Sequence, residues 1–253
     1  MKRRSVRLMI LVLVLQVLVV PAQEVIPSPA SVLGFQPGED RQLADWTQIT
    51  NYFRRLDEAS PRVQVLEIGR STQNRPILMA VITSPENMAR LDRYREIVRR
   101  LADPRTIPDE VEAERLIAEG RVIVAITCSI HSTEIVASQM AMELAYRLAS
   151  DTSPETGEIL DRVILLLFPS PNPDGIDIVA SWYRRTLGTP YEGTAPPELY
   201  HPYTGHDNNR DWFMLTQVET QALTRVLYRE WFPQILYDVH QICLLYTSDA
   251  ADE

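Results

Sequence analysis

Apolar and polar positions along the chain form short blocks that predict strands and helices in alternation. Three short apolar runs, at residues 121–127, 162–168 and 234–239, are typical of strands buried on both faces of a parallel sheet. Two further apolar runs, at 63–68 and 76–82, are joined by a polar connector and predict a β-hairpin.

Between and beside the strands, apolar residues recur at helical spacing. The expected helices cover residues 43–56, 87–101, 109–118, 134–148 and 216–229. We expect Ser132 or Thr133 to cap the fourth helix, and the segments 28–39 and 186–206, rich in proline and glycine, to be irregular. Alternating strands and helices predict an α/β fold, here a three-layer α/β/α domain with a mixed, largely parallel central sheet that is incomplete in this chain.

The first residues depart from this pattern. Residues 1–22 contain a basic start, an apolar run shorter than a membrane span and a small-residue cleavage site, which predicts a signal peptide. An uncleaved anchor is the alternative. We therefore expect a secreted or periplasmic protein, with no membrane contact beyond the export signal.

The last residues depart from it as well. Residues 243–253 resemble the translation of a transposase sequencing adapter, and Ile242 then derives from a hybrid codon. We expect the natural sequence to stop at Gln241. The chain is then divided into a signal peptide at 1–22, the N-terminal part of a catalytic domain at 23–242 and an artefact tail at 243–253.

Charge and cysteine content narrow the possible functions. The net charge is −9, so the protein is a poor candidate for binding nucleic acid or an anionic membrane. Outside the expected tail, Cys128 is the one cysteine, which excludes an internal disulfide there. Its place in an apolar strand predicts a core side chain and not a reactive thiol.

Polar residues follow directly after the predicted buried strands, where an open α/β sheet places its ligand site. His131 and Glu134 lie three residues apart, so both side chains can project to one side of a helix start. His240 ends a strand expected beside the one that leads to His131. Two imidazoles and one carboxylate are a ligand set of catalytic zinc sites. The plainer alternative is a helix-start histidine, an exposed glutamate and a core histidine.

These residues occur together with two further motifs, Asn172-Pro173-Asp174-Gly175 and Asp207-Asn208-Asn209-Arg210. In this order the motifs resemble those of the zinc carboxypeptidase family, and the resemblance covers about 46–241. It implies that His131, Glu134 and His240 hold one Zn²⁺.

The resemblance also implies roles for residues around the metal. Asp207 would hydrogen-bond His131, while Asn209 and Arg210 would hold the terminal carboxylate of a peptide substrate, for which a planar guanidinium is suited. A surface ion pair with Asp207 or Asp211 is the alternative for Arg210. Arg184 or Arg185 would polarise the scissile carbonyl, and alignment through Tyr183-Arg184-Arg185-Thr186 favours Arg184.

The activity expected from the resemblance is zinc-dependent hydrolysis of C-terminal peptide bonds by the intact protein. For Asp174 we expect only turn chemistry. The family's general-base glutamate has no counterpart before His240, so the chain as it stands is expected to be inactive. The alternatives are a related zinc amidohydrolase acting on cell-wall peptides or N-acyl amino acids, and an inactive binding module of the same fold.

Overall fold

The structure is a computed structural model that describes residues 25–198, 201, 204 and 207–241. The expected signal peptide at 1–22 and the expected tail at 243–253 lie outside the described residues. Across the described part, none of the helices has the length and apolar composition needed to span a membrane.

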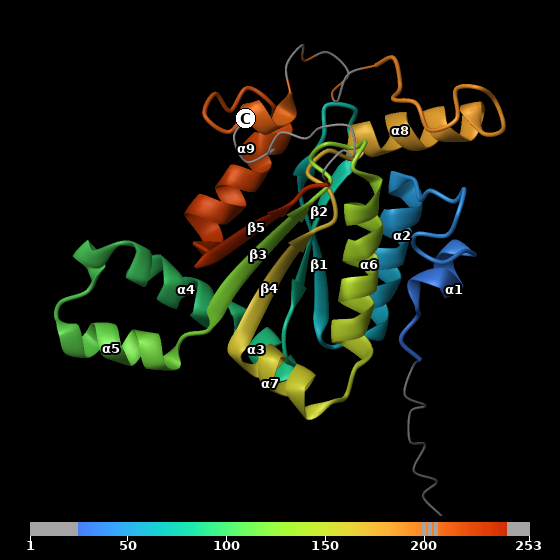
Figure 1. Cartoon of the computed structure of the whole chain (residues 1–253). Coiled ribbons are helices and arrows are strands. Elements are labelled where there is room, and N and C mark those ends of the chain that lie inside the picture. The colour runs from blue at the N-terminus through green and yellow to red at the C-terminus, as the bar shows by residue number, and fades with distance from the viewer. Residues whose placement is uncertain (1–24, 199–200, 202–203, 205–206, 242–253) are drawn as a thin grey trace, which may run out of the picture.

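One five-stranded sheet with the order β1-β2-β4-β3-β5 forms the centre of the described chain (Figure 1). Its strands are β1 (Val63–Arg70), β2 (Pro76–Ile82), β3 (Val122–Cys128), β4 (Val163–Phe168) and β5 (Ile235–Val239). Strand β2 is antiparallel to both neighbours, whereas β3 is parallel to β4 and to β5. All strands except β2 therefore run in one direction, and the expected mixed, largely parallel sheet is confirmed.

Helices cover both faces of this sheet (Figure 1). On one face lie α1 (Pro29–Leu33), α2 (Trp46–Ala59) and α6 (Ile135–Ser150). On the other lie α4 (Leu91–Ala102), α5 (Glu110–Glu119), α9 (Val218–Arg225) and the π-helix η3 (Val226–Trp231). The α/β/α layers are thus confirmed.

Side-chain alternation along the strands explains why two cores form. In β4, Leu165 and Leu167 enter the core beneath α2 and α6, while Ile164 and Leu166 enter the core beneath α4 and α9. Successive side chains of a strand point to opposite faces, so an unbroken apolar run requires cover on both sides.

Among the described residues, four helices begin with a serine or asparagine N-cap followed by proline, and apolar periodicity predicted none of these starts correctly. They are α1, α3 (Pro85–Met88), α7 (Pro154–Arg162) and α8 (Pro173–Thr186). The expectation of an irregular segment at 28–39 was therefore wrong at α1, and the helix expected at 87–101 is divided into α3 and α4. Proline suits the first turn of a helix, so the cap and the proline together were the available signal.

Strand β5 forms where it was expected, but it is not buried. Ile235, Leu236 and Tyr237 are 53%, 45% and 60% exposed. The reason is the position of β5 at the edge of the described sheet, where it pairs with β3 alone. Its apolar composition resembled that of a central strand, which is why the sequence predicted burial.

Candidate metal centre

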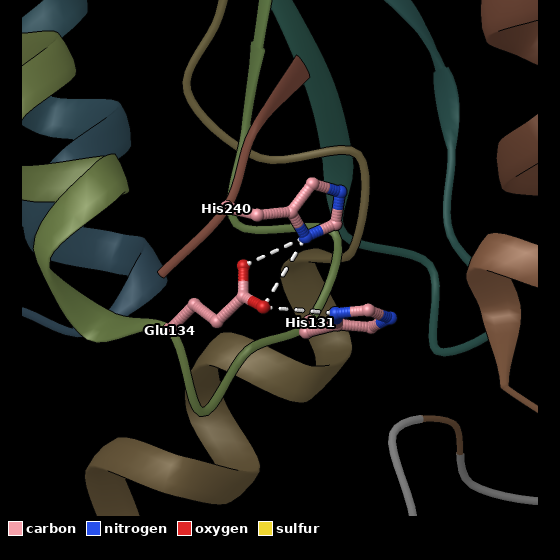
Figure 2. Close-up of side chains that lie close together, drawn as sticks. All are labelled: His131, Glu134 and His240. Carbon is pink, nitrogen blue, oxygen red and sulfur yellow. Dashed lines mark hydrogen bonds and ion pairs between the residues drawn. The ribbon is translucent and has the colours of Figure 1, made fainter. Parts of the chain in front are cut away.

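The candidate site lies at the carboxyl ends of two adjacent parallel strands. Cys128 of β3 pairs with Val239 of β5 at the end of the ladder, so the chain segments that leave both strands emerge side by side. His240 follows β5 directly, and His131 follows β3 after a short turn. Figure 2 shows both imidazoles turned toward the carboxylate of Glu134.

The three side chains converge closely. Oε1 of Glu134 lies 3.0 Å from Nδ1 of His131 and 3.2 Å from Nδ1 of His240. One ligand atom from each residue can be chosen so that all three lie within 4.8 Å of one another. The structure thus brings together the three residues that the sequence predicted as metal ligands.

A turn, and not a helix, creates this convergence. The backbone N–H of Glu134 donates to the carbonyl of His131 at 2.9 Å, and α6 begins only at Ile135. Helical spacing of His131 and Glu134 was therefore the wrong reason for their proximity. The expected cap from Ser132 or Thr133 is also wrong, because Glu134 occupies the N-cap position and its side chain makes no capping hydrogen bond. Instead, Gln241 accepts from the N–H of Val136 in the first turn of α6 at 2.8 Å.

Buried polar contacts shape the turn. Ser129, fully buried with a φ of 53°, donates its hydroxyl to the carbonyl of Glu134 at 3.0 Å and accepts from the N–H of Ser138 at 3.0 Å. The amides of Asn172 and Asn208 both donate to the carbonyl of Ile130, at 3.1 and 3.0 Å. These contacts join three distant parts of the chain at the residue before His131.

Each histidine also contacts a second carboxylate, at the ring nitrogen that does not face Glu134. Asp207 Oδ1 is 2.8 Å from Nε2 of His131, and Asp238 Oδ2 is 3.0 Å from Nε2 of His240. A carboxylate at Nε2 favours the tautomer that carries its proton there, which leaves Nδ1 as the ligand atom. Asp238 was missed by sequence reasoning, although its place two positions before His240 puts both side chains on one face of the strand.

The electrostatics of the site favour bound positive charge. Burial lowers the pKa of His131, but the hydrogen bond to Glu134 and the charge of Asp207 outweigh it, so the pKa lies above its usual value. Burial raises the pKa of Glu134, and the contacts with His131 and His240 reverse this, leaving it lowered. A metal ion that binds His131 would therefore compete with a proton for its imidazole.

Arg210 is an exposed residue whose backbone N–H donates to the carbonyl of Asp207 at 2.9 Å. Among the described residues it makes no side-chain hydrogen bond or ion pair, so the alternative of an ion pair with Asp207 or Asp211 is not found. The neighbouring Asn209 accepts from the indole N–H of Trp212 at 2.9 Å, and its own N–H donates to Asp207 at 2.8 Å. Asp207 thus links the Asn209-Arg210 segment to His131.

Arg184 is not brought to the three converging residues. It lies in the last turn of α8, where its guanidinium contacts Asp45 at 2.7 Å, the carbonyl of Leu43 at 3.0 Å and Gln48 at 2.9 Å. The expected role at the scissile carbonyl therefore has no geometric support, because these contacts direct the side chain to the start of α2.

The motif around Asp174 does not form the expected turn. Asn172 caps α8, and Asp174, 1% exposed, lies in its first turn. The carboxylate of Asp174 accepts from the hydroxyl of Ser71 at 2.6 Å and from the N–H of Gln73 at 2.9 Å, and it pairs with Arg75 at 2.9 Å. Its structural role is to hold the β1–β2 connector against α8.

The donor set fits a zinc ion. Glu134 Oε2 is buried and makes no hydrogen bond, although it lies 3.1 Å from Nδ1 of His240. Two ligands at ordinary zinc bond lengths in a tetrahedral site lie roughly 3.3 Å apart, close to the observed separations from Glu134 to the imidazoles. Nitrogen and carboxylate donors in this ratio match catalytic zinc.

Comparisons with known proteins agree with this chemistry. The chain matches the zinc carboxypeptidase family over residues 49–233, which leaves His240 just beyond the matched segment. A search of curated proteins gives no match.

Among solved structures, a metallo-carboxypeptidase from Burkholderia cenocepacia is 18% identical with a TM-score of 0.52, and the alignment covers 78% of this chain and 40% of that one. Carboxypeptidase A from Helicoverpa armigera is 13% identical with a TM-score of 0.51, covering 85% and 52%. This chain thus spans from two-fifths to half the length of these structures, whose likeness concerns the fold. By its match over most of its length, the chain belongs to the zinc carboxypeptidase family.

Proposed function

We propose that the intact protein is a zinc-dependent metallocarboxypeptidase that hydrolyses C-terminal peptide bonds, and that His131, Glu134 and His240 hold its single Zn²⁺. The observation that carries the proposal is the convergence of two imidazoles and one carboxylate, from segments more than 100 residues apart, within 4.8 Å. An exported location, secreted or periplasmic, belongs to the same proposal.

Zinc at this position would supply a Lewis acid that polarises a carbonyl and acidifies water. The residues of the chain would bind and orient the metal ligands and the substrate. Asp207 holds the proton of His131 at Nε2, which keeps Nδ1 available and fixes the orientation of the ring.

Arg210 and Asn209 would bind the free terminal carboxylate of the substrate. Support comes from the exposed guanidinium of Arg210, which has no partner among the described residues, and from its position next to Asp207. An arginine fork binds a carboxylate through two parallel hydrogen bonds, so a peptide with a free C-terminus is the substrate class that fits. Arg184 has no part in the proposal.

Two measurements test the function separately. The first is zinc binding by this chain, by competition with a chromophoric chelator, compared with His131→Ala. The second is release of C-terminal amino acids from peptides by the product of the uninterrupted gene, because the family's general base is expected after His240. Activity that persists in excess chelator would refute the zinc mechanism.

The carboxylate anchor is tested by peptides with free and amidated C-termini. Arg210→Ala should raise KM for the free peptides by about 10- to 100-fold, since a charge-assisted bidentate pair is lost. Arg147→Ala, which removes an exposed arginine of α6, is the matched control and should leave KM unchanged. Equal cleavage of both peptide types would contradict exopeptidase action, and preference for cell-wall peptides would favour an amidohydrolase.

A further inference from the structure

Asp238 links the edge of the sheet to the second histidine of the metal centre. One of its carboxylate oxygens, Oδ2, lies 3.0 Å from Nε2 of His240. The other, Oδ1, accepts a hydrogen bond of 2.6 Å from the hydroxyl of Thr127. The carboxylate is therefore held from one side and directed at the imidazole on the other.

The register of the sheet creates this chain of contacts. Thr127 of β3 and Asp238 of β5 are direct partners in the parallel ladder. Asp238 and His240 are two residues apart, so an extended backbone directs both side chains to the same face. Thr127, Asp238 and His240 are thus joined by two successive hydrogen bonds, and these bonds require that β3 and β5 pair in this register.

Asp238 is also an unusual residue for its position. Aspartate is depleted in strands, and here it interrupts an apolar run with a side chain that is 30% exposed. Among the described residues, Asp238 pairs with His240 and with no arginine or lysine. A structural explanation based on strand propensity or a salt bridge therefore does not account for it.

We propose that Asp238 is a positioning residue for His240 and that Thr127 holds Asp238 in place; the inference rests on the proposed zinc function. The carboxylate keeps the proton of His240 on Nε2, so that Nδ1 faces Glu134 and the metal position. Asp207 stands in the same relation to His131, and both imidazoles thereby present the same ring nitrogen.

The test compares the zinc affinity of the wild-type chain with that of Asp238→Ala, Asp238→Asn and Thr127→Val. A carboxylate behind a metal-binding histidine typically contributes 10- to 100-fold in affinity, so we expect a loss of about that size for Asp238→Ala. The near-isosteric Asp238→Asn removes the charge with little change of shape and should lose less. Thr127→Val should weaken binding by a few-fold, and Thr127→Ser, which retains the hydroxyl, should restore it.

A second readout separates positioning from general stabilisation. The absorption spectrum of the Co²⁺-substituted chain should change in Asp238→Asn, because the ligand field depends on the orientation of His240, while the zinc-free unfolding midpoint should change little. Asp92→Ala removes a fully exposed aspartate of α4 and controls for net charge.

The outcomes are distinguishable. Wild-type zinc affinity and an unchanged cobalt spectrum in both Asp238 variants would overturn the inference and leave the proposed function intact. A lower unfolding midpoint with unchanged zinc affinity would do the same, since it would assign Asp238 a structural role alone. Failure of the wild-type chain to bind zinc would overturn the proposed function and the inference together.

Discussion

At the scale of single residues, Asp211 illustrates how a buried carboxylate sets the shape of a functional segment. It is fully buried and accepts hydrogen bonds from the N–H of Gln217 at 2.9 Å and from the hydroxyls of Thr216 and Thr220. Burial alone would raise the pKa of Asp211, but these donors outweigh it and hold the pKa at about 2. The carboxylate fixes the chain immediately after Arg210.

The lowered pKa of Asp211 makes its contribution to stability dependent on pH. Because the folded-state pKa lies below the unfolded value of 3.8, the contribution is present above about pH 4 and is lost as the pH falls toward 2. Asp211→Asn should lower the free energy of unfolding by about 2 kcal/mol at pH 7. Urea titrations at pH 7, 4 and 2.5 measure the difference, and a difference that does not shrink at low pH would contradict the assignment.

Cys128 gives a second prediction at this scale. Burial, together with the charge of Asp238, raises the pKa of its thiol to about 12, and the side chain is fully buried. Since the thiolate is the reactive form, Cys128 should resist iodoacetamide in the folded protein and react after unfolding in urea. Peptide mass spectrometry measures this site separately from Cys243, and rapid modification without denaturant would show that β3 opens locally.

At the scale of elements, α8 packs closely against the turn before α6 that carries His131 and Glu134. Gly175 lies in the first turn of α8, where an added Cβ would lie 2.5 Å from Asn172 Nδ2 and 2.6 Å from Ser132 Oγ. Asn172 holds the carbonyl of Ile130, and Ser132 follows His131 directly. A side chain larger than glycine at position 175 would therefore displace Asn172 or Ser132, and with them the turn that carries His131.

Gly175→Ala should lower the free energy of unfolding by about 1–3 kcal/mol through overpacking and should also weaken zinc binding. Gly157→Ala in α7 is the matched control, because an added Cβ meets nothing within 4 Å there and alanine favours a helix. Urea unfolding and chelator competition measure both effects. If the two variants behaved alike, the close approach between α8 and the turn would not be a constraint.

At the scale of the whole molecule, a metal ion would join segments that the chain keeps far apart. His131 and Glu134 belong to the segment between β3 and α6, and His240 belongs to the end of β5. A ligand that binds only the folded state stabilises it by mass action. Zinc should therefore secure the edge strand β5 against separation from β3.

Zinc at a concentration 100 times its Kd should raise the thermal midpoint by about 5–10 °C, and His240→Ala should abolish the shift. Magnesium, which prefers oxygen ligands in octahedral geometry, is the control ion and should have little effect. Differential scanning calorimetry of the chain with each ion measures this. An equal shift with magnesium would argue against a site built on imidazoles.

The sequence by itself determined the layers, the five strands of the described sheet and the identity of the residues that converge. These features follow from local patterns, since apolar runs dictate burial on two faces and the ends of parallel strands meet at one edge of the sheet. Helices with a capped proline start were also encoded locally, in Ser153-Pro154 and Asn172-Pro173, although apolar periodicity alone did not reveal them.

Only the tertiary structure decided how these residues are supported and oriented. The hydrogen bonds that do this join positions 42 to 141 residues apart. They run from Arg184 to Leu43, from Asn172 and Asn208 to the carbonyl of Ile130, and from Thr127 to Asp238. Such contacts depend on strand register and on the angle at which a helix packs, and neither is present in a local pattern. For the same reason the exposure of β5 came from its place at the edge of the sheet, which its own apolar residues could not specify.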